Sequence, residues 1–356
     1  MTPEPKDKLD GMTTCSSAAT SAALSSPSCS SSGVVVPNGP EDDPADWLSI
    51  DWQCVEQDVR RLRQRIFTAT QAGDLKRVRS LQKLMLRSRA NTLLSVRRVT
   101  EVNAGRKTAG VDGKVVLLSS VKAELVGWVQ RNSGPWQARP VKRVYIPKRG
   151  STGKRRPLGI PVIVDRVLQA RVVNALEPEW EARFEPRSYG FRPGRGCHDA
   201  IESIYWTLKG RLSKRQWVLD ADLSAAFDRI DHERLLGHLG SFPGRGMVPG
   251  WLAAGVIEQG RFAPTEEGTP QGGVVSPMLL NIALHGMEEA AGVRYTRRDP
   301  LGAHVARDSP VLVRYADDFV VCVTPWTKQN RSGTGWLGGW PRGARVQRGQ
   351  DTHRPR

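Results

Sequence analysis

The stretch Val311-Leu312-Val313-Arg314-Tyr315-Ala316-Asp317-Asp318-Phe319-Val320-Val321 decides the fold. Two adjacent carboxylates stand between apolar, β-prone runs, which is the pattern of a tight hairpin with acids at its tip. Like charges held so close together destabilise a turn unless a cation neutralises them. Because Mg²⁺ prefers carboxylate and phosphate oxygens, the pair predicts phosphoryl transfer on a nucleotide. The alternative is an ordinary exposed turn, where Asp is common.

A second acid-tipped strand is predicted upstream, in Trp217-Val218-Leu219-Asp220-Ala221-Asp222. A two-metal site needs carboxylates from separate elements, so that two ions lie about 3.5–4 Å apart. Asp222 and Asp317 meet only if their two strands lie side by side. Asp220 shares a face with Asp222 but comes earlier on the strand, and we assign it no metal.

A glycine-rich segment, Glu267-Gly268-Thr269-Pro270-Gln271-Gly272-Gly273-Val274-Val275-Ser276-Pro277, lies between these two strands. Glycine lets the backbone approach a ligand closely. The apolar residues that follow, beginning at Leu279 and Leu280, predict a helix. A glycine-rich loop that opens a helix suits an anion, so its place between two acid-tipped strands indicates a nucleotide site.

The order of these motifs resembles the palm of reverse transcriptases, and it is closest to the group II intron-encoded proteins. The resemblance rests on Asp222 with Phe227, on Gln271-Gly272 with Ser276-Pro277, and on Tyr315-Ala316-Asp317-Asp318. It covers roughly Trp47 to Cys322. The supporting upstream strings are Thr108–Gly113, Arg156–Pro161, Asp165–Gln169 and Ser188–Arg195.

The resemblance implies an α+β right-hand polymerase core, with fingers and palm and without a thumb. It implies the RNA-directed DNA polymerase of a group II intron, which also assists splicing. Asp222, the backbone carbonyl of Leu223 and Asp317 would bind two Mg²⁺ ions, for which Mn²⁺ can substitute, and Asp318 would support them as the third catalytic acid. One ion would lower the pKa of the primer 3′-hydroxyl and the other would stabilise the leaving pyrophosphate.

The resemblance also assigns residues around the incoming nucleotide. Phe227 would select dNTPs by blocking the ribose 2′-hydroxyl, and the alternative is a core aromatic. Lys154 and Arg156 would reach the triphosphate, and the alternative is a basic hairpin that touches the template. Gln271 would contact the nucleotide or its base pair. The residues expected beside the primer and template are Gly272, Tyr315 and Ala316.

The charge distribution predicts a polyanionic partner. The net charge is +17, and residues 1–46, with seven acids and two bases, leave net +22 on the remaining chain. An imbalance this large favours nucleic acid over mere solubility. With the resemblance, the expected partners are intron RNA, an RNA template, a DNA primer or target and dNTPs. The sequence leaves the oligomeric state open.

The five cysteines and the hydropathy indicate the compartment. No CxxC pair occurs, so neither a zinc site nor a disulfide framework is predicted, which fits a reducing cytoplasm. No run of about 18 apolar residues and no secretory signal is evident. We therefore expect a cytoplasmic protein with no membrane partner.

Four regions are predicted along the chain. Residues 1–46 form a disordered Ser/Thr/Ala/Pro-rich tail, 47–115 a helical RNA-binding extension, and 116–323 the fingers and palm. Residues 324–356 lack helical periodicity, and we interpret them as a frameshift product that replaces the thumb, with a native basic tail as the alternative. The predicted elements are helices at 121–129, 163–183, 197–209, 231–239 and 248–259, strands at 141–147 and 217–222, and a hairpin at 311–323.

Two rival functions remain open. The chain is either an intron RNA-binding splicing cofactor with a vestigial catalytic centre or an inert fragment of a decayed mobile element. Three intact acids argue against long relaxation of the palm. A missing thumb argues against both polymerase and splicing activity, so we expect an impaired polymerase.

Overall fold

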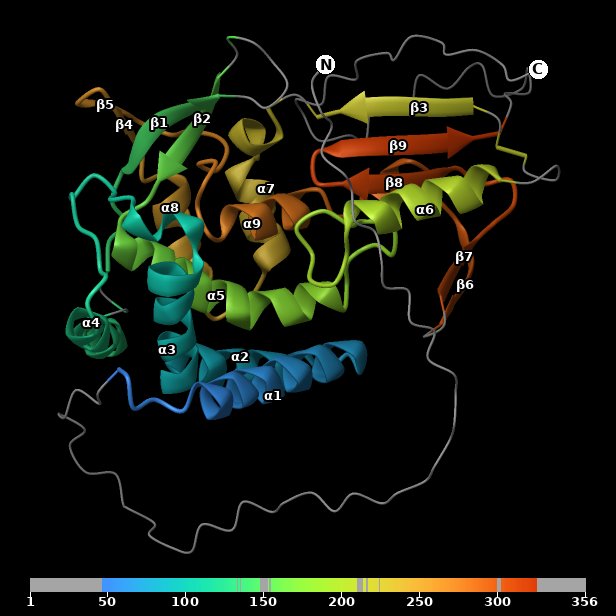
Figure 1. Ribbon diagram of the computed structural model, residues 1–356. Helices are drawn as coiled ribbons and strands as arrows, with labels where there is room; N and C mark the ends of the chain where they lie inside the picture. The colour runs from blue at the N-terminus through green and yellow to red at the C-terminus, as the bar shows by residue number, and fades with distance from the viewer. Residues whose placement is uncertain are drawn as a thin grey trace, which may run out of the picture. The chain divides into compact units, whose positions relative to one another are not determined.

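The computed structural model describes residues 47–132, 134, 136–147, 153, 155–209, 214–215, 217–223, 225–299 and 302–324. The predicted tail at 1–46, residues 325–356 of the predicted C-terminal tail, and Lys154 lie outside the described residues. The described part is an α+β fold, which confirms the fold class that the resemblance implies (Figure 1).

Two amphipathic helices begin the described chain, within the segment 47–115 that is predicted to be helical. Helix α1 spans Trp52–Gln71 and α2 spans Leu75–Arg87. The side chains of Asp51 and Asp74 cap them by accepting the backbone N–H groups three residues on. Between them Gly73 takes a φ of +72°, which ends α1. The helices that follow are α3 at Arg89–Arg97 and α4 at Ser119–Asn132.

Helix α5, Ile163–Glu181, is buried on nearly every side and lies between the N-terminal helices and the elements around α9 (Figure 1). It packs against α1, α2 and α3 on one side and against α9, Ser276–Ala283, on the other. The buried carboxylate of Glu179 on α5 is paired: it accepts from Arg79 at 2.5 Å and from the Gln82 side-chain amide at 2.8 Å. The N-terminal helices and the remaining fold therefore share one core.

The first sheet has the order β2-β1-β4-β5. Strands β1, Val141–Pro147, and β2, Arg155–Ile160, form an antiparallel hairpin, and β1 confirms the strand predicted at 141–147. The predicted helix at 248–259 is wrong: α8 covers only Val248–Leu252, and the chain then forms β4, Val256–Glu258, and β5, Arg261–Ala263.

Local backbone geometry explains the shortened helix α8. Gly255 takes a φ of +75°, and Gln259 and Gly260 both have positive φ, at 49° and 80°. Two successive positive φ values are the requirement of a two-residue hairpin of type I′. Val256 and Ile257 of β4 can then pair with the neighbouring strand β1. The hydrogen bonds of this pairing outweigh the weak helical pattern of the sequence.

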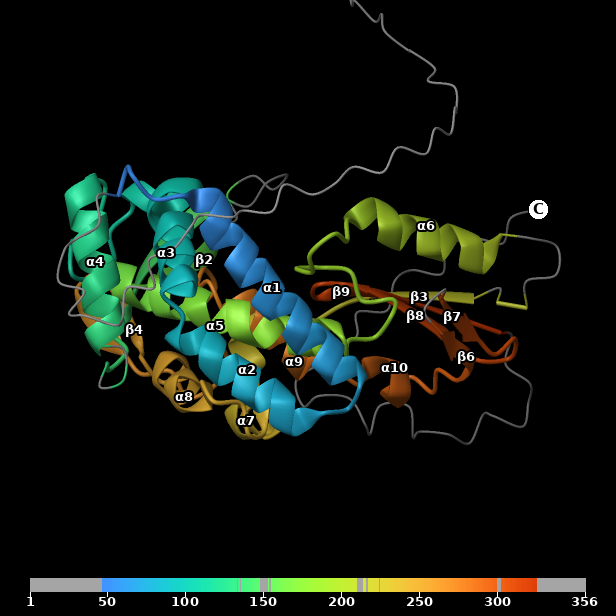
Figure 2. The ribbon, with the colours of Figure 1, turned by 90° about the horizontal axis from the view of Figure 1, so that it is seen from below.

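The second sheet, of order β3-β9-β8, carries the acids. Strand β3 spans Trp217–Asp222, β8 spans Val311–Tyr315 and β9 spans Asp318–Val323, which confirms the predicted strand and hairpin. Helix α6, Cys197–Leu208, covers one face of this sheet, as Figure 2 shows.

Side chains of the second sheet alternate between two cores. Val311, Val313 and Cys322 pack in a cluster with Ala200 of α6. Leu312, Phe319 and Val321 point to the opposite face and join the main core.

The remaining α-helices and strands of the described chain are α7 at His232–Leu239, α10 at Met287–Ala290, β6 at Tyr295–Asp299 and β7 at Gly302–Val305.

Candidate active site

The acids predicted from the two strands meet at one end of the second sheet. Strand β3 pairs antiparallel with β9, and Asp222 stands directly opposite Asp318. The Leu223 backbone N–H donates to the Asp317 carbonyl at 3.2 Å, so Asp317 adjoins the end of β3. The side chains of Asp222 and Asp318 are exposed, and that of Asp317 is partly exposed. The condition that the two strands lie side by side is therefore met.

Asp220 lies farther back on the same strand. It stands opposite Val320, so no acid lies directly across from it on β9. Directly opposed residues of an antiparallel pair point to the same side of the sheet. Asp220 therefore shares the face of Asp222 and Asp318 but is one step removed from their end of the sheet.

The turn between β8 and β9 is strained and tightly enclosed. Ala316 takes a φ of +58°, a conformation that residues with a Cβ adopt rarely, and its side chain is 5% exposed. The backbone of Gly190 lies against it, because a Cβ placed on Gly190 would be 2.1 Å from the Ala316 nitrogen. Only glycine fits at position 190, which explains its place in the Ser188–Arg195 string.

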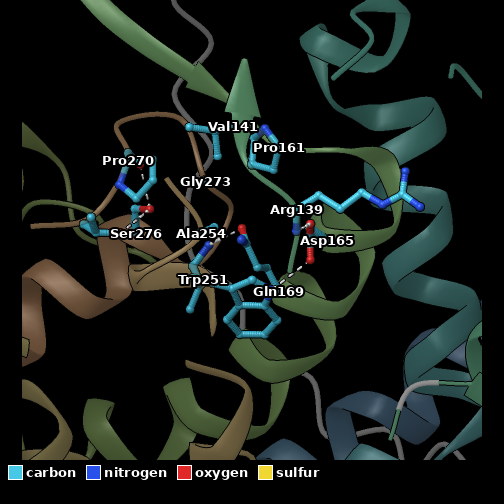
Figure 3. Close-up of a pocket in the computed structure, with 12 residues that line it drawn as sticks. Arg139, Val141, Pro161, Asp165, Gln169, Trp251, Ala254, Pro270, Gly273 and Ser276 are labelled. Atoms are coloured by element: carbon cyan, nitrogen blue, oxygen red, sulfur yellow. Dashed lines mark hydrogen bonds between the residues drawn. The ribbon is translucent and has the colours of Figure 1, made fainter. Parts of the chain in front are cut away.

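The glycine-rich loop is fixed between the fingers and α5. The Gly159 N–H of β2 donates to the Gln271 carbonyl at 2.5 Å, and Gly272 takes a φ of +112° against the Gly159 carbonyl. From below, the side-chain oxygen of Gln169 accepts the Val274 N–H at 2.8 Å. Figure 3 shows Gln169 pointing from α5 toward this loop. The loop therefore has a set backbone path, with Gln271 partly exposed and Gly272 exposed.

Asp165, one helical turn before Gln169, is buried and connects neighbouring segments through its hydrogen bonds. Its carboxylate accepts the indole N–H of Trp136 at 2.7 Å. It also accepts the indole N–H of Trp251 at 3.0 Å and the Arg139 backbone N–H at 3.1 Å (Figure 3). Burial raises the pKa of Asp165, and the three donors oppose that rise. The cavity beside these residues measures about 10 Å³, which is room for no more than one water, so Asp165 and Gln169 support the loop rather than line a substrate pocket.

Phe227 lies in the helical turn Ala226–Arg229 and is partly buried. Its carbonyl accepts the Thr269 N–H at 2.7 Å, which links it to the glycine-rich loop. The ring of Phe191 stands edge-on to it, with centroids 6.1 Å apart. Phe191 is 49% exposed and has a φ of +60°, a rare conformation for a bulky residue. Sequence reasoning gave Phe191 no role, and its only signal was its place inside the Ser188–Arg195 string.

The other predicted residues divide between exposed and enclosed positions. Arg156 is exposed on β2, where it stands opposite Ile146 of β1. Tyr315 is 39% exposed and pairs with Asp318 across the turn, whereas Ala316 is buried. Tyr315 and Ala316 therefore lie at the same end of the sheet as the acids.

The donor set suits a divalent cation only in part. Within the described ranges, no group of three or more His, Cys, Asp or Glu side chains is arranged to hold a metal ion. The Leu223 carbonyl already accepts the Ala226 N–H at 3.2 Å, which leaves one lone pair. Mg²⁺ is commonly bound by one or two carboxylates with water and substrate phosphate supplying the remaining ligands. Asp222 and Asp317 are ligands of this chemical kind and number.

Comparison with known proteins agrees with this geometry. Residues 47–128 match the N-terminal domain of reverse transcriptase, and residues 146–331 match the reverse transcriptase (RNA-dependent DNA polymerase) domain. The second match includes both acid-tipped strands and the glycine-rich loop.

No helix in the described part of the chain is long and apolar enough to cross a membrane.

Three relatives illustrate the similarity. Protein YkfC of Escherichia coli is 37% identical over 284 residues, which cover 72% of this chain and 74% of YkfC. The group II intron-encoded protein LtrA of Lactococcus lactis is 38% identical over 160 residues, 44% of this chain and 26% of LtrA. Maturase-like protein 1 of Euglena gracilis is 27% identical over 250 residues, 67% of this chain and 52% of that protein. The chain thus spans most of YkfC but about a quarter of LtrA.

Proposed function

This chain belongs to the reverse transcriptase family, in the branch of the group II intron-encoded proteins, and from that premise we propose that it catalyses RNA-templated DNA synthesis. One observation carries the proposal: Asp222 stands directly opposite Asp318, while Leu223 is bonded to Asp317. Opposed carboxylates cost stability in a sheet. A site that binds a cation gives a physical reason for keeping them.

Asp222, Asp317 and the Leu223 carbonyl are the proposed ligands, and Asp318 supports them. When bound, divalent ions would neutralise charge on the primer oxygen and the leaving pyrophosphate. The chain's own contribution is placement. The hydrogen bond from Leu223 to Asp317 holds the ends of β3 and β9 together, so the carboxylates need little reorganisation when substrate arrives.

The surrounding residues support nucleotide selection. We propose that the Phe227 ring excludes the ribose 2′-hydroxyl by its volume, and the edge-on contact with Phe191 would limit its movement. Arg156, exposed on β2, would offset triphosphate charge as a planar donor. Gln271 and Gly272 would lie beneath the nucleotide and the template base, since the loop that carries them is fixed by Gly159.

Templates and splicing both require an RNA surface, and α1 and α2 offer one. Their outward faces carry exposed bases, which are Arg60, Arg61, Arg65, Lys76, Arg77, Lys83 and Arg87. Many of these positions lie on the side of the helices that does not pack on α5. A concentrated positive face attracts phosphate backbones. We propose that it binds intron RNA, which supports splicing assistance as a second function.

Primer extension on poly-rA with oligo-dT tests the polymerase. The full chain should extend the primer weakly, because an impaired polymerase is expected, and Asp317→Ala should reduce that extension at least tenfold. Asp220→Asn is the matched control, because it changes an exposed acid on β3 that faces Val320 rather than an acid. Equal loss in both variants, or retained extension in Asp317→Ala, would contradict the assignment.

A separate measurement tests the RNA face. Replacing Arg60 and Arg65 with Gln should weaken binding to structured RNA and reduce its dependence on salt concentration. The matched control replaces Arg297 and Arg298 of β6 with Gln, which removes charge from another part of the chain. If the two sets of variants lose RNA affinity equally, binding is a property of net charge and not of this face.

A further inference from the structure

A buried arginine lies directly behind the acid turn. Arg314 is the fourth residue of β8 and is completely buried, in a strand that is otherwise apolar up to Tyr315. Strand alternation turns it away from α6, toward the main core that Leu312 also faces. Burying a guanidinium is costly unless it is hydrogen-bonded, so its presence requires a reason.

The guanidinium joins three segments that are far apart in the sequence. One terminal nitrogen donates to the Asn281 side-chain oxygen of α9 at 2.9 Å and to the Ala316 carbonyl at 3.0 Å. The other donates to the Ser188 hydroxyl at 2.7 Å. The planar fork of arginine allows these contacts at once, whereas a lysine ammonium cannot span them in the same geometry.

The same network encloses the turn from its other side. Asn281 donates to the Gly190 carbonyl at 2.9 Å, and Gly190 is the residue packed against the Ala316 nitrogen. The backbone of Arg314 is also fixed, by Arg187 and Tyr189 at 2.9 Å each. Ala316, with its positive φ, is therefore held at its nitrogen side by Gly190 and at its carbonyl by Arg314. A strained residue persists only where its surroundings determine it in this way.

The Ala316 carbonyl belongs to the peptide bond that leads into Asp317. Because that peptide is planar, fixing its oxygen also fixes its nitrogen and the start of Asp317. We propose that Arg314 is a positioning residue: it holds the Ala316–Asp317 peptide so that the Asp317 carboxylate meets Asp222. This proposal rests on the polymerase function for its catalytic consequence, but its structural content stands without it.

The charge of Arg314 remains in place at neutral pH. Burial lowers its pKa to about 10, and the nearby carboxylates of Glu185 and Glu288 oppose the fall. Its Nε atom is buried without a hydrogen-bond partner in the described structure, which shows that the terminal nitrogens carry the interaction. The contacts therefore act as charge-assisted hydrogen bonds, which are about twice as strong as neutral ones.

Hydrogen exchange on the full chain without metal tests the structural content. Arg314→Met should speed amide exchange in peptides that cover 311–323 by about tenfold or more, the effect of losing hydrogen bonds to a charged group. Arg171→Met is the matched control: Arg171 is also buried, its pKa is also lowered to about 10 by burial, and it donates to Leu86 of α2. This control should leave the amide exchange rates of 311–323 unchanged, once they are corrected for the change that the substitution causes in the free energy of unfolding. Equal exchange in both variants would overturn the proposal.

Steady-state extension tests the catalytic consequence. Arg314→Lys should lower kcat by about ten- to hundredfold while the dNTP KM and the template affinity stay within about twofold, because only the acid turn is displaced. Asn281→Ala should produce a smaller loss of the same kind. A rise in KM at constant kcat would assign Arg314 to substrate binding and overturn the proposal. If the parent chain extends no primer, the polymerase proposal fails alone, and the exchange measurement still decides the role of Arg314.

Discussion

Replacing Asp222 with Asn should make the metal-free protein more stable while removing its polymerase activity. Asp222 and Asp318 stand directly opposite each other on adjacent strands, where like charges repel. Asn keeps the shape of the side chain and removes one charge. Stability and activity therefore change in opposite directions at this position, which is the signature of a site kept for binding rather than for folding.

The magnitude follows from the geometry. Directly opposed side chains in an antiparallel pair have Cβ atoms about 4.5–5.5 Å apart, and such a pair contributes about 0.2–1 kcal/mol. Because both side chains are exposed, the lower half of that range applies. For a domain of this size, about 1 kcal/mol moves Tm by about 2–4 °C. The expected gain for Asp222→Asn is therefore about 0.5–2.5 °C.

Divalent metal should reverse the order. A ligand that binds only the folded state at ten times its Kd adds about 1.4 kcal/mol. Mg²⁺ should thus raise the Tm of the parent chain by several degrees and leave Asp222→Asn almost unchanged. Differential scanning fluorimetry with EDTA and with a Mg²⁺ titration measures both shifts. Ca²⁺ and Na⁺ at equal ionic strength separate specific binding from screening.

Asp220→Asn is the control for this experiment as well. It removes the same charge from the same strand face, but its partner is Val320. It should change Tm by less than about 0.5 °C in EDTA, as surface substitutions usually do, and keep the Mg²⁺ response of the parent. The reasoning would be refuted if Asp222→Asn lowered Tm in EDTA, or if it responded to Mg²⁺ as the parent does.

Three further outcomes are expected. Phe227→Val should raise rNTP incorporation relative to dNTP, and Phe191→Leu should do so more weakly because it only loosens the ring contact; an unchanged ratio in a single-nucleotide assay would make Phe227 a core aromatic. Filter binding to structured RNA should weaken steeply with salt, because residues 47–356 carry net +22, and a flat response would contradict polyanion binding. Burial lowers the pKa of His285, as do the nearby Arg183, His238 and Arg314, whereas Glu185 opposes the fall. The unfolded chain therefore binds more protons than the folded protein, and Tm should fall as pH drops below about 6.5. The variant His285→Gln should reduce that fall in Tm, and the variant His304→Gln, at an exposed position, should not.

Much of the site was predictable because its signals are local. A strand that ends in acid and a two-residue turn flanked by apolar alternation specify both their own conformation and the face of each side chain. Their pairing followed from the need to bring Asp222 and Asp317 together, and β3 does pair with β9. The resemblance to a family supplied the roles of Phe227 and Gln271, which composition and spacing did not.

The remaining features could not be predicted because they depend on tertiary neighbours. The segment 253–259 has a weak helical pattern, but strand pairing with β1 and positive φ at Gly255 decide its conformation. Nothing near Arg314 in the sequence indicates that its partners are Ser188 and Asn281. The one local indication of a special role was a charged residue inside an apolar strand. A strand with one face exposed to solvent would also contain such a residue.

The central place of α5 has a consequence for synthesis on the ribosome. Helices α1 to α3 are complete by Arg97, but the helix on which they pack ends at Glu181. At about 5–20 residues per second, the apolar sides of these helices stay without their partner for several seconds. During that interval Val59, Ile66 and Val78, all buried in the finished protein, are open to chaperones and to other nascent chains. The N-terminal helices therefore cannot complete their packing before α5 has been made, and the yield of folded protein should depend on the rate of translation between residues 97 and 181.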